Sequence, residues 1–132
     1  MEIIYTDQDR PTIEEIIDLY LSAGLKRPVD DSTRIERMYA NSNLILTARL
    51  NGQLIGIARS LTDFGFCCYL SDLAVRKEFQ SSGIGKQLVA KTKEIVGNQC
   101  MVLLLAAANA IEYYPKIGMD KVDNGFIIKR SI

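Results

Sequence analysis

The amino-acid sequence predicts an α/β (α+β) protein with a mixed, mostly antiparallel, twisted sheet of about six or seven strands, flanked by about four helices. Three observations support this fold class. Apolar residues follow a helical period in the first 40 residues, and then follow a strand pattern around the pair Asn51-Gly52. The helical period returns after the two glycines Gly83 and Gly85. The predicted element order is β-α-α-β-β-β-α-β-α-β-β.

The N-terminal part predicts one short strand and two helices. Residues 2–6 can form the strand, and residues 11–22 form the first helix. Four apolar side chains of that helix share one face: Ile13, Ile16, Ile17 and Tyr20. Gly24 can end the helix, because glycine adopts the left-handed conformation of a helix C-terminus. A second, short helix is expected to begin near Ser32.

The middle of the chain predicts an antiparallel meander of three strands. Residues 44–50 and 53–61 flank Asn51-Gly52, which is typical of a two-residue hairpin turn because both turn positions need a positive φ. A second turn is expected at residues 63–65. A longer strand over residues 66–75 follows.

A helix and a buried strand are expected after the glycines. The helix covers residues 86–97, with Gly97 at its C-terminus. Its apolar side chains share one face: Leu88, Val89, Ile95 and Val96. The continuous apolar run 101–107 has the pattern of a strand that is buried on both faces.

The last part of the chain predicts a short helix and a closing hairpin. Residues 109–119 form the helix, and the segments 119–122 and 126–130 form the two strands of the hairpin. The turn between these strands is Asp123-Asn124-Gly125. This hairpin would bring the sheet to its full number of strands.

Size and charge limit the classes of protein that the chain can belong to. Residues 1–132 are expected to be a single domain. Sixteen basic residues balance sixteen acidic ones, which argues against nucleic-acid binding. The longest apolar run, 101–108, is far shorter than the roughly 20 residues of a membrane span. The first residues lack the basic start of a signal peptide, so we expect a cytoplasmic protein without a membrane partner.

The residue types present also limit the chemistry. The chain has no histidine, which excludes Ser-His-Asp and Cys-His catalysis and any metal site that contains histidine. Its three cysteines, two of them adjacent at Cys67 and Cys68, do not form a disulfide framework. We therefore expect no metal. Acid–base chemistry is left to Tyr, Asp, Glu, Lys, Cys or water.

The stretch "EFQSSGIGKQL", residues 78–88, predicts an anion site between a strand and a helix. Such a turn exposes main-chain N–H groups at the positive end of the helix dipole, which suits a phosphate or a pyrophosphate. The alternative is a tight turn in which the glycines serve the geometry alone. Two nucleotide-binding patterns do not fit, because Gln87 follows Gly85-Lys86 where a P-loop has Ser or Thr, and Leu88 replaces the third glycine of the dinucleotide fingerprint.

The turn Gln80-x-x-Gly83-x-Gly85, the preceding "DLAV" and the later "NAIEYYPKIGM" together resemble the Gcn5-related N-acetyltransferase (GNAT) superfamily. The resemblance covers nearly the whole chain and includes the predicted order of helices and strands. Two departures from the family pattern are present. Pro115 directly follows Tyr114, which would favour a kink there, and Met119 stands where the family usually has Phe.

The resemblance implies acetyl-CoA as the cofactor, with CoA as the product. The pyrophosphate would be bound by the turn that comprises Gln80, Ser81, Ser82, Gly83, Ile84, Gly85 and Lys86. Leu73, Ala74 and Val75 would pair with the pantetheine arm as a strand would, and Asn109 would contact the arm. A main-chain N–H at Leu73 would donate to the thioester carbonyl and stabilise the charge that develops there.

Tyr114 matches the tyrosine of the family that gives a proton to the departing thiolate and also contacts the cofactor. Its alternatives are a core aromatic role and replacement by Tyr113. Asp72 is a candidate for orienting water or binding a cationic substrate, or it simply caps the edge of a strand. Strand alternation would place it on the face opposite Tyr69, Ser71 and Leu73.

The predicted function is transfer of an acetyl group to a primary amine of a small molecule, peptide or protein, by direct attack in a ternary complex. A non-catalytic acyl-CoA-binding sensor or interaction module on the same fold is the alternative. A toxin-like activity on aminoacyl-tRNA is disfavoured by the zero net charge. Homodimer formation is left open.

Overall fold

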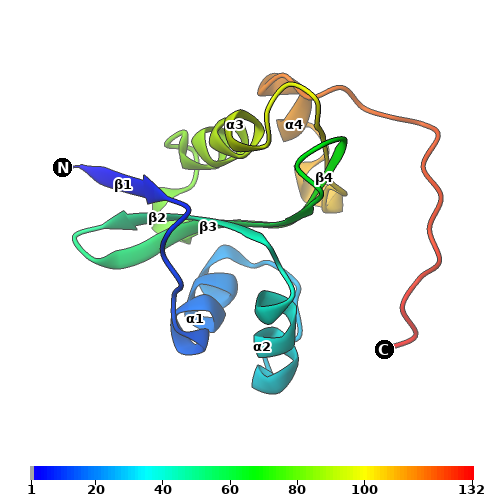
Figure 1. The fold of residues 1–132 in the computed structure, drawn as a ribbon. Coiled ribbons are helices and arrows are strands. Elements are labelled where there is room, and N and C mark those ends of the chain that lie inside the picture. Colours follow the sequence, from blue (N-terminus) through cyan, green and yellow to red (C-terminus); the bar gives the residue numbers. More distant parts are fainter. Residues whose placement is uncertain (1) are drawn as a thin grey trace.

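The structure is a computed structural model that describes residues 2–132, and it contains one five-stranded sheet (Figure 1). The strands lie in the order β1-β2-β3-β4-β5, with antiparallel neighbours except for the parallel pair β4–β5. They comprise Ile3–Thr6 (β1), Leu44–Leu50 (β2), Gln53–Thr62 (β3), Cys67–Val75 (β4) and Met101–Leu103 (β5). The mixed α/β class and its mostly antiparallel sheet are therefore confirmed.

Helices cover both faces of the sheet (Figure 1). The helices α1 (Ile13–Ala23) and α2 (Ser32–Ala40) lie on one face, and α3 (Ile84–Val96) and α4 (Tyr113–Lys116) lie on the other. Each face has its own apolar core. Ile16, Leu19 and Tyr20 of α1 pack with Ile45 and Ile57 on one side, and Ile84, Leu88 and Val89 of α3 pack with Leu46, Ala48 and Leu70 on the other.

Local sequence signals set the ends of the first helix and the first hairpin. Thr12 accepts a hydrogen bond from the N–H of Glu15, and the Glu15 carboxylate accepts one from the N–H of Thr12, so the two residues form a capping box. Gly24 ends α1 with φ 73°. Asn51 and Gly52 have φ values of 50° and 82°, which confirms the predicted hairpin turn.

The end of the sheet differs from the prediction. The closing hairpin over residues 119–130 is absent from the described chain, so the sheet has five strands and not six or seven. The strand β5 has only three residues, and Met101 is 53% exposed, so this strand is not buried on both faces. A strand persists only where a neighbour supplies hydrogen bonds, and no neighbouring strand lies beside residues 119–130.

Candidate active site

A cleft opens where β4 and β5 separate. The two strands pair only between Cys67–Tyr69 and Met101–Leu103, and beyond this point the C-terminal half of β4 has no neighbour on that side. The resulting cavity has a volume of about 590 Å³. Its walls are the end of β4, the segment after β5, the turn before α3, and α4.

A bulge in β4 sets which side chains enter the cleft. Asp72 pairs with Arg59, whereas Leu70 pairs with Ser60, so Ser71 is an extra residue in β4. The bulge reverses the strand alternation: Leu70 and Leu73 both pack against the core on the α3 side. Ser71 hydrogen-bonds Asp72 through its hydroxyl, and the register puts Tyr69 on the face of Asp72. The prediction that Asp72 faces away from Tyr69 and Ser71 is therefore wrong, and only the opposition to Leu73 is confirmed.

The main chain of β4 offers hydrogen-bonding groups to the cleft. The N–H of Arg76 donates to the carbonyl of Ile55, and Arg76 continues the antiparallel ladder of β3 and β4. Main-chain groups alternate in direction along a strand. Those of Leu73 and Val75 therefore point away from β3, toward the side that β5 has left. The carbonyl of Val75 accepts a hydrogen bond from the Gln80 side chain at 3.0 Å.

The glycine turn places an uncapped helix N-terminus at one end of the cleft. Ser81 and Gly83 have positive φ values of 70° and 88°, and Gly83 is the N-cap residue directly before α3. No side chain caps this end, and the first turn of α3 contains no acidic residue. The first intrahelical bond runs from the N–H of Gln87 to the carbonyl of Gly83, so the N–H groups of the first turn have no partner within the helix.

The two tyrosines of α4 lie at different places in the cleft. A Cβ atom on Gly85 would lie 2.9 Å from the hydroxyl oxygen of Tyr113, so Tyr113 lies directly over the glycine turn. Tyr114 is half-buried in the same cleft, and the two rings meet edge to face with centroids 5.2 Å apart. Burial, and to a smaller degree Tyr113, raises the pKa of Tyr114 above its usual 10, which keeps its hydroxyl protonated at neutral pH.

Pro115 does not disrupt this helix. It is the third residue of α4, where its missing N–H would have no intrahelical partner. The main-chain N–H of Met119 donates to the carbonyl of Tyr114 at 3.1 Å, which closes the end of the helix. The kink that Pro115 was expected to cause at Tyr114 therefore does not form, and Tyr114 lies within the single turn of α4.

Asp72 is fully buried in a polar network beside the cleft and does not line the cleft itself. Its carboxylate accepts hydrogen bonds from the Tyr20 hydroxyl at 2.7 Å, Arg27 Nε at 2.6 Å, Arg59 Nε at 2.8 Å and the Ser71 hydroxyl at 3.2 Å. Burial alone would raise the pKa of Asp72, but the hydrogen bond and charge of Arg59, and then the charge of Arg27, outweigh it, so the pKa is lowered.

Most of the predicted site residues line the cleft. They are Leu73, Ala74, Val75, Gln80, Ser81, Gly83, Gly85, Lys86, Asn109 and Tyr114. Ser82, Ile84 and Asp72 do not line it. Ile84 is buried in the core, and the Ser82 hydroxyl donates to the carbonyl of Phe79.

Sequence reasoning missed Arg27, which also lines the cleft. Its Nη2 atom donates to the carbonyl of Ser71 at 2.7 Å, and its Nε atom donates to Asp72, so it holds the bulge from the side of the cleft. Nothing in the surrounding "GLKRP" indicates this role, because both partners lie more than 40 residues away.

The cysteines lie apart from the cleft lining. Cys67 is exposed, and Cys68 and Cys100 are buried. Desolvation and the carboxylate of Asp63 raise the pKa of Cys67, and burial raises the pKa of Cys68. Within residues 2–132, no group of three or more His, Cys, Asp or Glu side chains is arranged to hold a metal ion.

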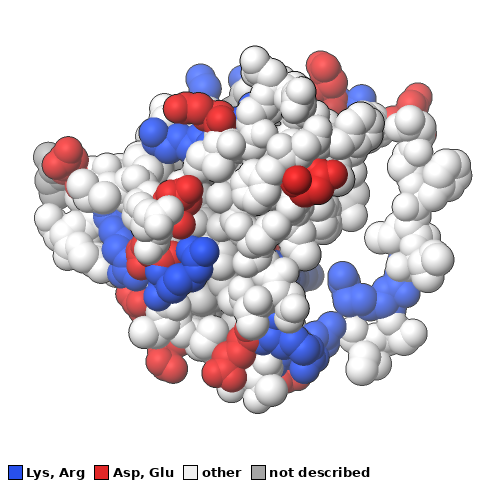
Figure 2. All heavy atoms as spheres, in the orientation of Figure 1, with Lys and Arg blue, Asp and Glu red and all other residues white. Residues whose placement is uncertain are grey.

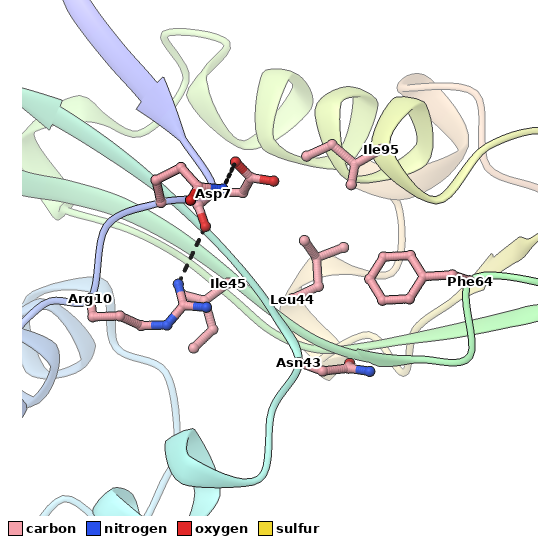
Figure 3. A pocket seen from close by; sticks show the side chains of 8 residues that line it. Asp7, Arg10, Asn43, Leu44, Ile45, Phe64 and Ile95 are labelled. Carbon is pink, nitrogen blue, oxygen red and sulfur yellow. Dashed lines mark hydrogen bonds between the residues drawn. The ribbon is translucent and has the colours of Figure 1, made fainter.

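A second cavity, of about 380 Å³, lies elsewhere (Figure 3). It is bounded by the connection from β1 to α1, the start of β2, the turn after β3 and the end of α3. One of its polar contacts is the hydrogen bond from Arg10 Nη1 to the carbonyl of Asp7, at 3.4 Å. None of the predicted site residues lines this cavity.

Comparison with known proteins agrees with the fold. The acetyltransferase (GNAT) family matches residues 10–119 of this chain. The chain belongs to this family, whose members use acetyl-CoA, and it is an N-acetyltransferase. No helix within residues 2–132 is long and apolar enough to cross a membrane.

The individual relatives are only distantly similar to this chain in sequence. The chain is 26% identical to the N-acetyltransferase ycf52 of Pyropia yezoensis, over 94% of this chain and 74% of that protein. It is 31% identical to the chloroplastic GCN5-related N-acetyltransferase 2 of Arabidopsis thaliana, over 55% of this chain but only 29% of that protein. Among solved structures, the Staphylococcus aureus protein SA2161 superposes with a TM-score of 0.82, at 25% identity, over 98% of this chain and 100% of that one. The structure of AAC(6')-Iy in complex with a CoA bisubstrate analogue superposes with a TM-score of 0.74, at 13% identity, over the full length of both chains.

Proposed function

We propose that this protein transfers the acetyl group of acetyl-CoA directly to a primary amine of a small molecule, peptide or protein. The observation that carries the proposal is the cleft itself. One wall presents the outward main-chain groups of Leu73 and Val75, and one end presents the uncapped N-terminus of α3. Such an arrangement suits a ligand with an extended amide-containing arm and a pyrophosphate.

Each wall of the cleft would hold a different part of acetyl-CoA. The N–H groups of the glycine turn, with Lys86 beside them, would bind the pyrophosphate. Gly83 lets it approach the backbone, whereas the space beside the α-carbon of Gly85 holds the Tyr113 hydroxyl. Val75 and Leu73 would hydrogen-bond the pantetheine arm, and Asn109 would contact it. The bound thioester supplies an activated acyl group.

Two groups would act on the reacting atoms. The main-chain N–H of Leu73 would donate to the thioester carbonyl, where negative charge develops during attack by the amine. The Tyr114 hydroxyl, kept protonated by its raised pKa, would give its proton to the departing thiolate. Attack is direct, because none of the three cysteines lines the cleft and the pKa values of Cys67 and Cys68 are raised, which lowers their thiolate content.

Asp72 has a supporting role in this proposal. Its oxygens are fully occupied by four donors and no part of it is exposed, so an amine in the cleft does not reach it. It positions Arg27, and through Arg27 the carbonyl of Ser71 and the bulge that orients Leu73. We therefore assign Asp72 as a positioning residue. The attacking amine would lose its proton to water.

The proposal is tested by two measurements on the full chain. Acetyl-CoA is titrated calorimetrically, and the release of CoA thiol is then followed with a panel of small amines and peptides. We expect saturable binding and thiol release that depends on the amine. Binding without release for every amine class would support the non-catalytic sensor instead, and the absence of binding would overturn both functions.

A further inference from the structure

The second cavity, of about 380 Å³, is separate from the cleft and has no part in the proposed function. One of its walls is the turn before β4, whereas the cleft opens at the other end of that strand, and the two share no lining residue. Its volume is within the range of about 300–1,000 Å³ in which proteins hold small-molecule ligands. A ligand could therefore occupy this cavity without contacting the cleft.

The cavity has a charged end and an apolar end. Figure 3 shows Asp7 and Arg10 at one end and Phe64 and Ile95 at the other, with Leu44 between them. Leu44 is buried in the core, whereas Phe64 is 48% exposed and Ile95 is 38% exposed. A ligand that covered these two side chains would remove apolar surface from water, which favours binding.

The charged end has hydrogen-bonding groups that are not in use. Arg10 donates through Nη1 to the carbonyl of Asp9 at 3.1 Å, but within residues 2–132 its Nε and Nη2 atoms donate to no protein group. Asp7 accepts from Gln8 Nε2 through Oδ1 at 3.0 Å, and its Oδ2 atom has no donor among the same residues. A guanidinium binds a carboxylate through two parallel hydrogen bonds, and a carboxylate accepts hydrogen bonds from an ammonium group. This end therefore offers one group for a carboxylate and one for an ammonium.

Phe64 has an uncommon backbone conformation. Its φ is 59°, in the left-handed region that a bulky residue rarely adopts. The turn is held by its polar neighbours: Thr62 Oγ1 accepts from the N–H of Phe64 at 3.0 Å, and Asp63 Oδ1 accepts from the N–H groups of Gly65 at 2.9 Å and Phe66 at 2.8 Å. None of these bonds needs an aromatic side chain at position 64. Strained positions cluster at ligand sites, so the ring of Phe64 is the part of this turn that would serve a ligand.

We propose that the cavity binds a free α-amino acid with a large apolar side chain. The α-carboxylate would accept from Arg10 Nε and Nη2, and the α-ammonium group would donate to Asp7. The side chain of the ligand would cover Leu44 and Ile95 and contact the ring of Phe64. Both charged groups of such a ligand are attached to one carbon atom, which suits a carboxylate and a guanidinium at the same end of the cavity.

The charge distribution of the molecule favours a ligand without net charge. Sixteen basic residues balance sixteen acidic ones. Figure 2 shows acidic and basic side chains interspersed on the face that it presents, so no extended field of one sign covers this face to attract a polyanion or a polycation. Recognition of charge is left to local groups such as Asp7 and Arg10.

NMR titration of the isotope-labelled full chain with L-phenylalanine, and separately with L-leucine, tests the location of the site. Both ligands should give saturable shifts of the backbone amide signals of Asn43, Phe64 and Ile95. Such shifts would support the site whether or not signals of the cleft, such as those of Gly83 and Asn109, also respond. Shifts confined to the cleft, or no saturable shifts, would overturn the proposal.

Ligand analogues combined with variants test each charge. Calorimetric titration should show that L-phenylalaninamide, which lacks the carboxylate, and N-acetyl-L-phenylalanine, which lacks the ammonium group, bind about tenfold or more weakly than L-phenylalanine. Arg10→Gln should weaken binding of L-phenylalanine to the same extent and leave that of the amide unchanged. Asp7→Asn should do the same with N-acetyl-L-phenylalanine as the unaffected ligand. Arg130→Gln is the matched control, because Arg130 is exposed and does not line the cavity, and it should keep wild-type affinity.

Phe64→Gly tests the aromatic ring. Glycine adopts a positive φ without strain, so the turn should persist in this variant. Its affinity for L-phenylalanine should fall about tenfold or more, because the apolar contact is lost. L-Alanine, which has no large side chain, should bind equally weakly to the wild type and to the variant. Wild-type affinity for L-phenylalanine in Arg10→Gln, Asp7→Asn or Phe64→Gly would overturn the proposal.

Discussion

Tyr113 and Tyr114 are adjacent in sequence, yet the proposed function gives their hydroxyl groups different roles in the cleft. The hydroxyl of Tyr113 lies over Gly85, at the end where α3 begins, whereas Tyr114 is the more buried of the two. Helical spacing separates neighbouring side chains by about 100°. A change of one position in the motif would therefore exchange a residue near the proposed pyrophosphate site for one near the proposed thioester site.

Tyr114→Phe should lower kcat on the order of 100-fold, because it removes the proposed proton donor to the thiolate and almost no volume. The KM for acetyl-CoA should change little, since the lost interaction belongs to the transition state. Steady-state kinetics with saturating amine measure both constants. Because the pKa of Tyr114 is raised, wild-type kcat should not fall from ionisation of this group until the pH exceeds 10.

Tyr113→Phe is the matched control for that experiment. Its kcat should stay within about twofold of wild type, and any effect should appear in the KM for acetyl-CoA. A large loss of kcat in Tyr113→Phe, with Tyr114→Phe unaffected, would show that Tyr113 and not Tyr114 donates the proton. If both variants keep wild-type kcat, single-turnover kinetics would show whether the chemical step is rate-limiting.

Asp72→Asn should lower the free energy of unfolding by about 3–5 kcal/mol at pH 7, because it leaves Arg27 and Arg59 without their buried counter-charge. The pKa of Asp72 is lowered in the folded state, and that of an unfolded Asp is about 3.9. Its contribution is therefore complete above about pH 5 and is lost as the pH falls toward the folded pKa.

The difference between wild type and Asp72→Asn should consequently shrink as the pH falls below about 4. Urea unfolding at pH 7, 5 and 3 measures it, with Glu36→Gln as the control for an exposed carboxylate without hydrogen bonds. That control should stay within about 0.5 kcal/mol of wild type. A difference that is the same at all three pH values would show that the charge of Asp72 is not what stabilises the network.

At the scale of elements, the turn before α3 needs a positive φ at Gly83, and the proposed function gives the same residue a role in ligand binding. Gly83 and Gly52 have nearly equal φ values, 88° and 82°, and a Cβ atom on either would meet nothing within 4 Å. An alanine at either position therefore introduces the same strain of about 1–2 kcal/mol. Of these two glycines, only Gly83 lines the cleft.

Gly83→Ala should therefore weaken acetyl-CoA binding about tenfold or more, whereas Gly52→Ala should leave it unchanged. Both variants should lose similar thermal stability. Calorimetric titration and thermal unfolding of the two variants separate strain from ligand contact. Equal affinity of the two variants for acetyl-CoA would show that the glycine turn does not bind the pyrophosphate.

The elements differ in how far the sequence alone could predict them. Thr12, Glu15, Asn51 and Gly52 act through partners within three residues, so the first helix and the first hairpin were predictable. The bulge at Ser71 was not, because it depends on a register with Arg59 and on the side chain of Arg27, and no glycine or proline marks it.

The candidate site also divides into residues that local sequence patterns predict and residues that depend on contacts with distant parts of the chain. The turn residues and Tyr114 belong to short motifs with recognisable spacing, and most of them do line one cleft. Arg27 reaches the cleft only through the packing of α1 against β4, which no local pattern records. The sequence left Asp72 open as a group that orients water, binds a cationic substrate or caps the edge of a strand. Its burial among Tyr20, Arg27 and Arg59 became visible only in three dimensions.

At the scale of the whole molecule, the sheet of one chain is incomplete. The sequence predicted a closing hairpin from the strand pattern of residues 119–130, and the structure leaves that segment unpaired. The strand pattern records the propensity of a segment, whereas a strand forms only where a neighbouring strand completes its main-chain hydrogen bonds.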